Sequence, residues 1–360
     1  MKEAGGQLNN HREAARALLA WYGENKRDLP WRRDPSPYQV WISEIMLQQT
    51  RVEAVIGYYE RFLEALPDVR ALAEAPEDLY LKLWEGLGYY SRVRNLHKAA
   101  RVVTEELGGE MPRTAAELLK LPGIGPYTAA AIASIACGED VPAVDGNLLR
   151  VFARLTDCHD SILTPKARKD AEGFFSGMMP EGTGGTFNQA LMDLGATVCL
   201  PNGAPRCEVC PVADRCLAKE RGTAAELPYR PKKAARKVDD LTVFLIRMSR
   251  GVLLHKRPGK GLLAGLYEFP NATGHLTEKE AAAYVEGLGL EPLRLKALEP
   301  AKHIFTHREW HMEGYEVRVS GWQEFEQDAP DEDGYFVADK EDIDRKWSVP
   351  SAFAAFRDKL

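Results

Sequence analysis

The sequence predicts a multidomain protein, with an all-α domain over residues 1–221 and an α+β domain over residues 241–360. Two observations lead to this prediction. Apolar residues recur at helical spacing in the first part, and short apolar runs bounded by turn residues follow residue 241. The length of 360 residues, 45% of them hydrophobic, is sufficient for two packed cores.

The first part contains a series of segments with the spacing of amphipathic helices. We expect them at residues 8–25, 36–47, 53–66, 76–85, 92–107, 127–137, 146–155, 165–178 and 186–197. In the second of these, Ser36 suits the N-cap, Pro37 the first helical position, and Gln39 completes a capping box. The residues that follow are apolar nearly all round, so this helix should be buried.

Glu44 interrupts the apolar surface of that helix. It lies on one stripe with Val40 and Leu47, at the i, i+4, i+7 spacing. An unpaired carboxylate in such a place is costly, and burial raises its pKa. Glu44 is therefore either a functional acid or a residue that pairs with an arginine or reaches the surface, and the sequence leaves both interpretations open.

A glycine-rich turn precedes the helix at 127–137. Gly123 and Gly125 flank one apolar residue, and this spacing permits positive φ and a close backbone approach. Pro126 suits the first helical position. Residues 115–137 therefore predict a helix-hairpin-helix, whose free N–H groups bind a DNA phosphate. An ordinary helix–helix turn is the alternative.

The segment 86–90 reads Gly-Leu-Gly-Tyr-Tyr and interrupts the series of helices. Two glycines followed by two tyrosines predict a projecting loop with aromatic tips. Such tips can wedge between bases. The alternative is that both tyrosines pack on a core.

Four of the six cysteines lie within eighteen residues, at Cys199, Cys207, Cys210 and Cys216. Nothing in the sequence indicates secretion, so we expect a metal centre rather than disulfides. Structural zinc sites with four cysteines usually contain two C-x-x-C knuckles, whereas this spacing contains one. The pattern favours a [4Fe–4S] cluster, with zinc as the alternative.

Residues 222–240 are expected to form a basic linker. Residues 226–260 carry ten Lys or Arg against three acids, and residues 324–344 carry ten acids against one Lys. The net charge of -6 therefore conceals a basic stripe compatible with nucleic acid on one face. Beyond the linker we expect strands at 241–247, 252–256, 301–306 and 310–319, and helices at 277–288 and 351–359.

With these features together, the first 220 residues resemble the endonuclease III superfamily of helix-hairpin-helix DNA glycosylases. Three segments narrow the likeness to the MutY family of adenine DNA glycosylases. Residues 41–50 read Trp-Ile-Ser-Glu-Ile-Met-Leu-Gln-Gln-Thr, residues 86–92 read Gly-Leu-Gly-Tyr-Tyr-Ser-Arg, and residues 143–147 read Ala-Val-Asp-Gly-Asn. The C-terminal part resembles that family's nudix-like domain, so the likeness covers almost the whole chain.

The resemblance implies removal of adenine mispaired with 8-oxoguanine or G in double-stranded DNA. Glu44 matches the family's general acid, and Asp145 matches the carboxylate that stabilises the sugar cation. Tyr127 and Asn147 match groups that support this centre. The residues assigned to DNA or to the base are Trp31, Arg32, Gln49, Thr50, Leu87, Tyr89, Gly123, Gly125, Gln189, Phe305, Thr306 and His307, with Arg32 and Gln189 at the adenine pocket. The four clustered cysteines match the ligands of a [4Fe–4S] cluster.

Position 127 separates two reaction classes within the superfamily. Bifunctional relatives have a lysine there, which forms a Schiff base and cleaves the strand. Tyr127 has no amine, so the resemblance implies a monofunctional enzyme that leaves an abasic site. Asp145 lies near a helix start and glycines, where donors should keep a carboxylate charged.

Three departures from the family pattern stand out. The first cysteine gap holds seven residues instead of the usual six, and Thr306 replaces the usual serine in the Phe-Ser-His loop. Glu278, Glu280 and Glu286 have the wrong spacing for the metal helix of a nudix hydrolase, so this domain should recognise rather than hydrolyse.

Other functions compete with this interpretation. They are a bifunctional pyrimidine glycosylase/lyase, a non-catalytic DNA-binding or redox module, and a nucleotide pyrophosphatase. The sequence has neither a signal peptide nor an apolar run as long as a membrane span, so we expect the protein in the cytoplasm, associated with the nucleoid if bacterial. We also expect a monomer.

Overall fold

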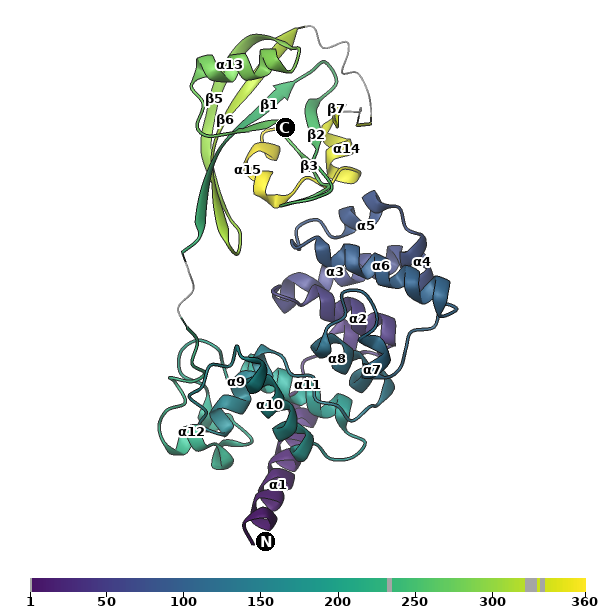
Figure 1. The fold of residues 1–360 in the computed structure, drawn as a ribbon, viewed down its shortest axis with the longest axis vertical. Helices are drawn as coiled ribbons and strands as arrows, with labels where there is room; N and C mark the ends of the chain where they lie inside the picture. Colours follow the sequence, from purple (N-terminus) through teal and green to yellow (C-terminus); the bar gives the residue numbers. More distant parts are fainter. Residues whose placement is uncertain (1, 232–234, 321–328, 331–333) are drawn as a thin grey trace. The chain divides into compact units, whose positions relative to one another are not determined.

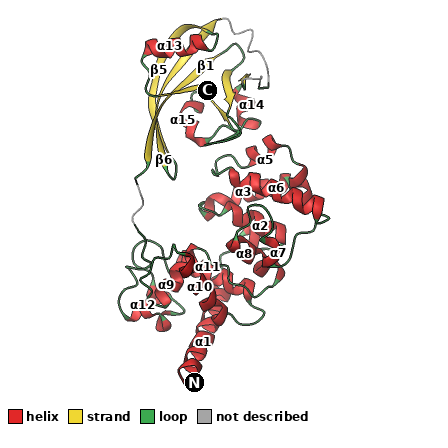
Figure 2. Ribbon diagram, in the orientation of Figure 1, coloured by secondary structure: helices red, strands yellow, loops and turns green. Residues whose placement is uncertain are grey.

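A computed structural model of the protein describes residues 2–231, 235–320, 329–330 and 334–360. The chain divides into two compact units, residues 1–74 with 94–232, and residues 75–93 with 233–360. The first unit is helical, and the second contains a sheet with helices (Figures 1 and 2). Lys232, Lys233 and much of the acidic segment 324–344 lie outside the described residues.

The helices of the first unit agree closely with the sequence prediction. They are α1 (Lys2–Asn25), α2 (Pro37–Met46), α3 (Val52–Ala65), α4 (Val69–Glu74), α6 (Ser91–Glu106), α7 (Ala115–Leu118), α8 (Pro126–Cys137), α9 (Gly146–Leu155), α10 (Pro165–Met178), α11 (Gly184–Thr197) and α12 (Leu217–Glu220), with 3-10 turns at Pro30–Arg32, Cys207–Val209 and Ala213–Arg215. The first turn of α6 belongs to the second unit. The short helices α4, α7 and α12 have too few residues to show a helical period in the sequence.

The start of α2 has the predicted capping box. Ser36 Oγ accepts from the backbone N–H of Gln39 at 3.2 Å, and Gln39 Oε1 accepts from the backbone N–H of Ser36 at 3.1 Å. From Val40 to Met46 the helix is buried, and its neighbours include α3 and α8. This burial places Glu44 away from water, since only 6% of the residue is exposed.

The hairpin between α7 and α8 has the expected turn, with one difference. Gly123 adopts a φ of +75°, and a Cβ there would lie 2.5 Å from Cβ of Asn95. Gly125 has a φ of -92° and is the N-cap of α8. The positive φ that this glycine pair permits is therefore present at Gly123 and absent at Gly125, because the cap needs an extended backbone rather than a left-handed one.

A core of α1, α9, α10 and α11 fills the other part of this unit. It contains the buried side chains of Leu18, Leu148, Phe175 and Leu194. Three of the clustered cysteines, Cys199, Cys210 and Cys216, pack against the same core. The core therefore supports the cysteine loop from one side.

The second unit contains the strands β1 (Lys237–Arg247), β2 (Val252–Lys256), β3 (Tyr267–Glu268), β4 (Asn271–Thr273), β5 (Glu291–Ile304), β6 (Arg308–Ser320) and β7 (Tyr335–Ala338), and the helices α5 (Glu77–Leu83), α13 (Glu278–Gly287), α14 (Lys340–Arg345) and α15 (Ala354–Arg357), with a 3-10 turn at Ser351–Phe353. The strand order is β3-β2-β1-β6-β5, β4 pairs with β1, and β7 pairs with β2. β1 and β6 are parallel, and the other pairs are antiparallel.

The sheet is covered on both faces, which explains the continuous apolar run in β1. Val243 and Leu245 join a core with Trp347 and Phe356, whereas Phe244 packs in a different core with Val285 of α13. Successive strand residues point to opposite faces, so both faces must be apolar when both are covered. β1 and β5 extend further than predicted, and β1 begins within the segment assigned to the linker.

Residues 75–93 contact the sheet domain, although the sequence places them between helices of the first unit. Asp78 Oδ1 accepts from the Tyr267 hydroxyl at 2.9 Å, and Arg357 Nη1 donates to Glu85 Oε1 at 2.6 Å. Lys82 Nζ donates to the carbonyl oxygen of Ile343 at 2.9 Å. These contacts join residues far apart in the chain, so the boundary at residue 221 does not separate the two compact units.

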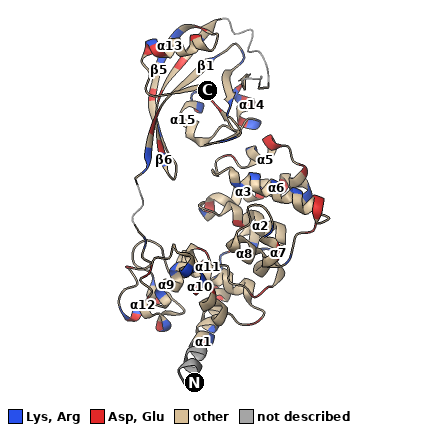
Figure 3. Cartoon of the chain, in the orientation of Figure 1, with Lys and Arg blue, Asp and Glu red and all other residues tan. Residues whose placement is uncertain are grey.

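The basic stripe predicted at residues 226–260 is partly neutralised within the second unit. Arg236 pairs with Glu309 at 3.5 Å, and Lys237 pairs with Asp239 at 2.9 Å. Figure 3 shows Lys and Arg next to Asp and Glu along the strands. The stripe therefore offers less positive charge than a count of its residues predicts. Among the described residues, no helix is long and apolar enough to cross a membrane.

Candidate active site and cysteine cavity

A cavity of about 380 Å³ in the first unit brings many of the predicted site residues together. Its walls come from the 27–32 turn, α2 with the turn after it, and the helices α8, α9 and α11. Its lining includes Trp31, Arg32, Glu44, Gln49, Thr50, Tyr127, Asp145, Asn147 and Gln189. Both predicted carboxylates therefore face the same space, from elements distant in sequence.

Glu44 is a buried acid with a hydrogen-bonding partner. The Tyr127 hydroxyl donates a hydrogen bond to Glu44 Oε2. Burial raises the pKa of Glu44 to about 7, and the nearby charge of Asp145 acts in the same direction. The Tyr127 hydrogen bond and the charge of Arg32 oppose this rise. Burial also raises the pKa of Tyr127 well above its usual value, so this phenol keeps its proton.

Asp145 is the N-cap of α9. Its Oδ1 accepts from the backbone N–H groups of Asn147 and Leu148, both at 2.8 Å, and its Oδ2 accepts from Asn147 Nδ2 at 2.8 Å. Burial raises the pKa of Asp145, whereas these donors and Arg150 lower it. The expected donors are present, and the pKa nevertheless rises because loss of hydration outweighs them.

Asn147 is held by a residue that the sequence argument missed. Arg150 Nη2 donates to Asn147 Oδ1 at 2.9 Å and to the carbonyl oxygen of Gly195 at 2.7 Å. Its Nε donates to the carbonyl oxygen of Cys199 at 2.7 Å. Arg150 is 2% exposed. The sequence could have identified Arg150 from its charge, because it stands on the apolar, buried face of α9.

Arg32 is held by Asp193, a second missed residue. Arg32 Nη1 and Nη2 donate to the two carboxylate oxygens of Asp193 at 2.7 and 2.8 Å, and Arg27 Nε donates to Asp193 Oδ1 at 2.7 Å. Asp193 has no exposed side-chain surface. It lies one turn after Gln189 on α11, and its place in that apolar helix could have identified it as Glu44 was identified.

Near the cavity, the turn after α2 carries the residues matched to the duplex. Gln49 and Thr50 line the cavity, and Gln49 has a φ of 61°. A positive φ is uncommon for a non-glycine residue and indicates a backbone held by its surroundings. The role of both residues in filling the duplex stays a prediction.

The 86–90 loop, in the second unit, exposes only one of its tyrosines. Tyr89 is 45% exposed, whereas Tyr90 and Leu87 are each 6% exposed. Arg92 Nη2 donates to the carbonyl oxygens of Leu87 at 2.9 Å and Gly88 at 3.1 Å. The expectation of two projecting aromatic tips is thus wrong for Tyr90, which packs inward. Leu87 is buried here, and its insertion into DNA stays a prediction.

The predicted lesion-reading residues form the turn between β5 and β6. Phe305 packs edge-on against Trp310 with ring centroids 4.9 Å apart, and Thr306 and His307 are exposed. The Tyr89 hydroxyl and Thr306 Oγ1 form a hydrogen bond. The structure therefore brings together two residues that the sequence assigned separately to the lesion.

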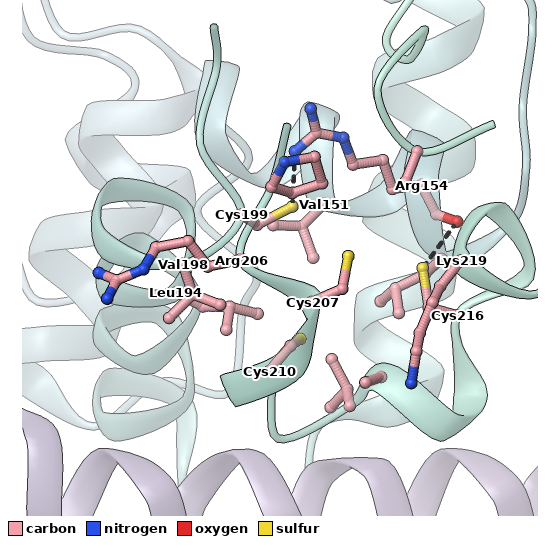
Figure 4. Close-up of a pocket in the computed structure, with 15 residues that line it drawn as sticks. Val151, Arg154, Leu194, Val198, Cys199, Arg206, Cys207, Cys210, Cys216 and Lys219 are labelled. Atoms are coloured by element: carbon pink, nitrogen blue, oxygen red, sulfur yellow. Dashed lines mark hydrogen bonds between the residues drawn. The ribbon is translucent and has the colours of Figure 1, made fainter. Parts of the chain in front are cut away.

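The four clustered cysteines border a second, small cavity of about 20 Å³ (Figure 4). Arg154 Nη1 donates to Cys199 Sγ at 3.1 Å, and Cys216 Sγ donates to the carbonyl oxygen of Arg154 at 3.3 Å. Arg206 and Lys219 also line this cavity. None of the four is in a disulfide. Among the described residues, no set of three or more His, Cys, Asp or Glu side chains has the arrangement of a metal site.

Comparison with protein families matches two parts of the chain. Residues 42–176 match the model of HhH-GPD superfamily base excision DNA repair proteins, and residues 242–358 match the NUDIX domain model. Among solved structures, a thermostable thymine-DNA glycosylase is 29% identical with a TM-score of 0.54, covering 59% of this chain and 98% of its own. An endonuclease III–DNA complex, 22% identical with a TM-score of 0.51, shares the fold, covering 60% of this chain and 97% of its own.

Curated relatives cover both parts of the chain. The human adenine DNA glycosylase is 36% identical over 85% of this chain and 67% of its own length. The enzyme of that name from Buchnera aphidicola subsp. Schizaphis graminum is 31% identical over 86% of this chain and 88% of its own. With this likeness along the chain and both carboxylates facing one cavity, the protein belongs to the adenine DNA glycosylase family.

Proposed function

We propose that the protein hydrolyses the N-glycosidic bond of adenine in duplex DNA as a step of base excision repair. The observation that carries this proposal is the cavity in which Glu44, with a pKa of about 7, faces the same space as Asp145. Relatives with the name adenine DNA glycosylase support the choice of base. A base paired inside a duplex must be flipped out to reach such a cavity.

Glu44 supplies the proton in this proposal. Adenine is a poor leaving group until a ring nitrogen is protonated, and an acid with a pKa near 7 is partly protonated at neutral pH. The Tyr127 hydroxyl donates to Oε2 of Glu44. A proton on the carboxyl group can therefore reside on Oε1, and the contact fixes the orientation of the acid.

Asp145 acts on the sugar. As the C1′–N9 bond breaks, its electron pair moves to the base and positive charge develops on the sugar. The carboxylate of Asp145 stabilises that charge, and three donors at 2.8 Å hold it in place. Water then adds to C1′ and loses a proton, which leaves an abasic site.

The chemistry stops at the abasic site. Strand cleavage by a glycosylase/lyase needs an amine that forms a Schiff base with C1′. At the corresponding place the cavity presents the phenol of Tyr127. We therefore infer a monofunctional enzyme.

We infer that the four cysteines are the ligands of a [4Fe–4S] cluster. All four border one cavity, and four thiolates are the usual ligand set for this cluster. Arg154, Arg206 and Lys219 line the same cavity and would offset the negative charge of the ligands. The group would supply a structural link across residues 199–216, close to Arg150 and its contact with Asn147.

The partner is double-stranded DNA with adenine opposite 8-oxoguanine or G. Tyr89 and Thr306, which are hydrogen-bonded in the second unit, support recognition of the opposite base by this unit. The hydroxyl of Thr306 can donate or accept, as the usual serine would.

The test is incubation of the full chain with duplexes that contain A opposite 8-oxoguanine, A opposite G, or A opposite T. We expect adenine release from the first two and strand breaks only after alkali. Release of a pyrimidine, or borohydride trapping of the protein on DNA, would contradict the proposal. DNA binding without base release would favour the non-catalytic module.

A further inference from the structure

We propose that Tyr22 is a positioning residue for base recognition, which fixes the side-chain amide of Gln189 in the orientation that reads the flipped-out purine. This inference rests on the proposed function, because it concerns the base that the cavity receives. Neither the family motifs nor the lining of the cavity includes Tyr22.

Tyr22 reaches Gln189 from a different helix. Tyr22 lies on α1 and is 5% exposed, and its hydroxyl donates to Gln189 Oε1 at 2.7 Å across 167 residues of sequence. Burial raises the pKa of Tyr22, so its hydroxyl keeps the proton that it donates. In the structure this bond directs the amide oxygen of Gln189 toward Tyr22.

The bond determines what Gln189 offers to a base. With its oxygen held by Tyr22, the amide nitrogen has no hydrogen-bond partner within the part of the chain that the structure describes, and Gln189 lines the cavity. The amide nitrogen is thus available to donate to an acceptor nitrogen of a purine ring. Without Tyr22, the amide would sample other rotamers, and the base would have to order it.

One turn further along α11, a second side chain that is matched to the adenine pocket is also fixed by hydrogen bonds. Asp193, four residues after Gln189, binds both terminal nitrogens of Arg32, and the Arg32 guanidinium lies 5.7 Å from the centre of the Tyr22 ring. Tyr22 therefore contacts both residues matched to the adenine pocket. Such preorganisation lowers the cost of binding a base in one orientation.

A double-mutant cycle tests the inference. Single-turnover adenine release from duplexes with A opposite 8-oxoguanine is measured at saturating enzyme for the wild type, Tyr22→Phe, Gln189→Ala and the double variant. Loss of one hydrogen bond predicts a rate about 5- to 10-fold lower for Tyr22→Phe. If Tyr22 acts through Gln189, adding Tyr22→Phe to Gln189→Ala has no further effect. Additive losses, or an unchanged rate for Tyr22→Phe, would overturn the inference.

Tyr38→Phe is the matched control for a merely structural effect. The buried Tyr38 hydroxyl donates to the carbonyl oxygen of Leu66 at 2.9 Å, outside the cavity lining. We expect this variant to lose stability with an unchanged rate.

Affinity for a duplex with a tetrahydrofuran abasic analogue should be unchanged in Tyr22→Phe, because no base enters the cavity. An equal loss of that affinity would make Tyr22 structural. The wild-type rate tests the proposed function, and the ratios between variants test Tyr22.

Discussion

The Tyr127 hydroxyl donates a hydrogen bond to the carboxyl group of Glu44. This contact joins α8, which follows the glycine hairpin, to the buried helix α2. Burial and the hydrogen bond act in opposite directions on the pKa of Glu44, and burial has the larger effect. The acid therefore titrates at about pH 7 and can serve as a proton donor under neutral conditions.

Glu44→Gln should bind DNA with the mispair and fail to release adenine. The amide keeps the shape of the side chain and loses the transferable proton, so we expect a loss of 10²-fold or more, roughly the contribution of a general acid. Single-turnover release and duplex affinity are measured together. The control is Glu64→Gln, which removes an exposed acid from α3. A normal rate for Glu44→Gln would assign the acid elsewhere.

The rate should fall as the pH rises through about 7, because Glu44 then loses its proton. The Tyr127 hydrogen bond lowers this pKa. The Tyr127→Phe variant should therefore shift the alkaline limb of the pH–rate profile to higher pH. Because the fold raises the pKa of Glu44 from its ordinary value of 4.5 to about 7, protonated Glu44 also contributes stability to the fold. This contribution is fully present below pH 4.5 and is lost as the pH rises through about 7. A limb that stays in place in Tyr127→Phe would contradict the assignment.

Asp145→Asn should lose most activity and keep its fold. Asparagine is as good an N-cap as aspartate, so α9 should begin at the same residue, while the sugar cation loses its counter-charge. The matched control is Asp339→Asn, because Asp339 caps α14 by accepting from the backbone N–H of Asp342 at 2.8 Å. Circular dichroism and single-turnover rates separate the two effects. Full activity in Asp145→Asn would point to another carboxylate.

The protein purified without oxygen should be brown and contain about four irons per chain, as expected for one [4Fe–4S] cluster. Replacing Cys210 by Ser should lower the iron content and destabilise residues 199–216, since metal binding and loop folding are coupled. Replacing the isolated Cys158 should leave the iron content unchanged. A colourless protein with one zinc would refute the cluster.

Replacing Phe305, Thr306 and His307 together by alanine should reduce the preference for A opposite 8-oxoguanine over A opposite G. A lost contact of this kind costs roughly 1–3 kcal/mol of discrimination. Full-length protein is used, because contacts such as Asp78 with Tyr267 would be lost on truncation. The control replaces Ser249 and Arg250 by alanine. Both residues are exposed and lie in the turn between β1 and β2. An unchanged ratio of rates would remove residues 305–307 from the site.

Local chemistry made several features predictable from the sequence. The capping box at Ser36 and the proline at the start of α8 depend on residues a few positions apart, and both are present. Burial of Glu44 followed from the apolar surface of its own helix. Such features need no knowledge of distant contacts, because their energetics are decided within one or two turns.

Long-range contacts decided the remaining features. The bond from Tyr22 to Gln189, the clamp of Asp193 on Arg32 and the docking of residues 75–93 on the sheet domain join residues more than 150 positions apart. The sequence by itself determined the type of most of the longer elements, and it identified the two carboxylates. Only the tertiary structure decided which residues hold them, because a buried polar group takes its partner from whichever element packs against it.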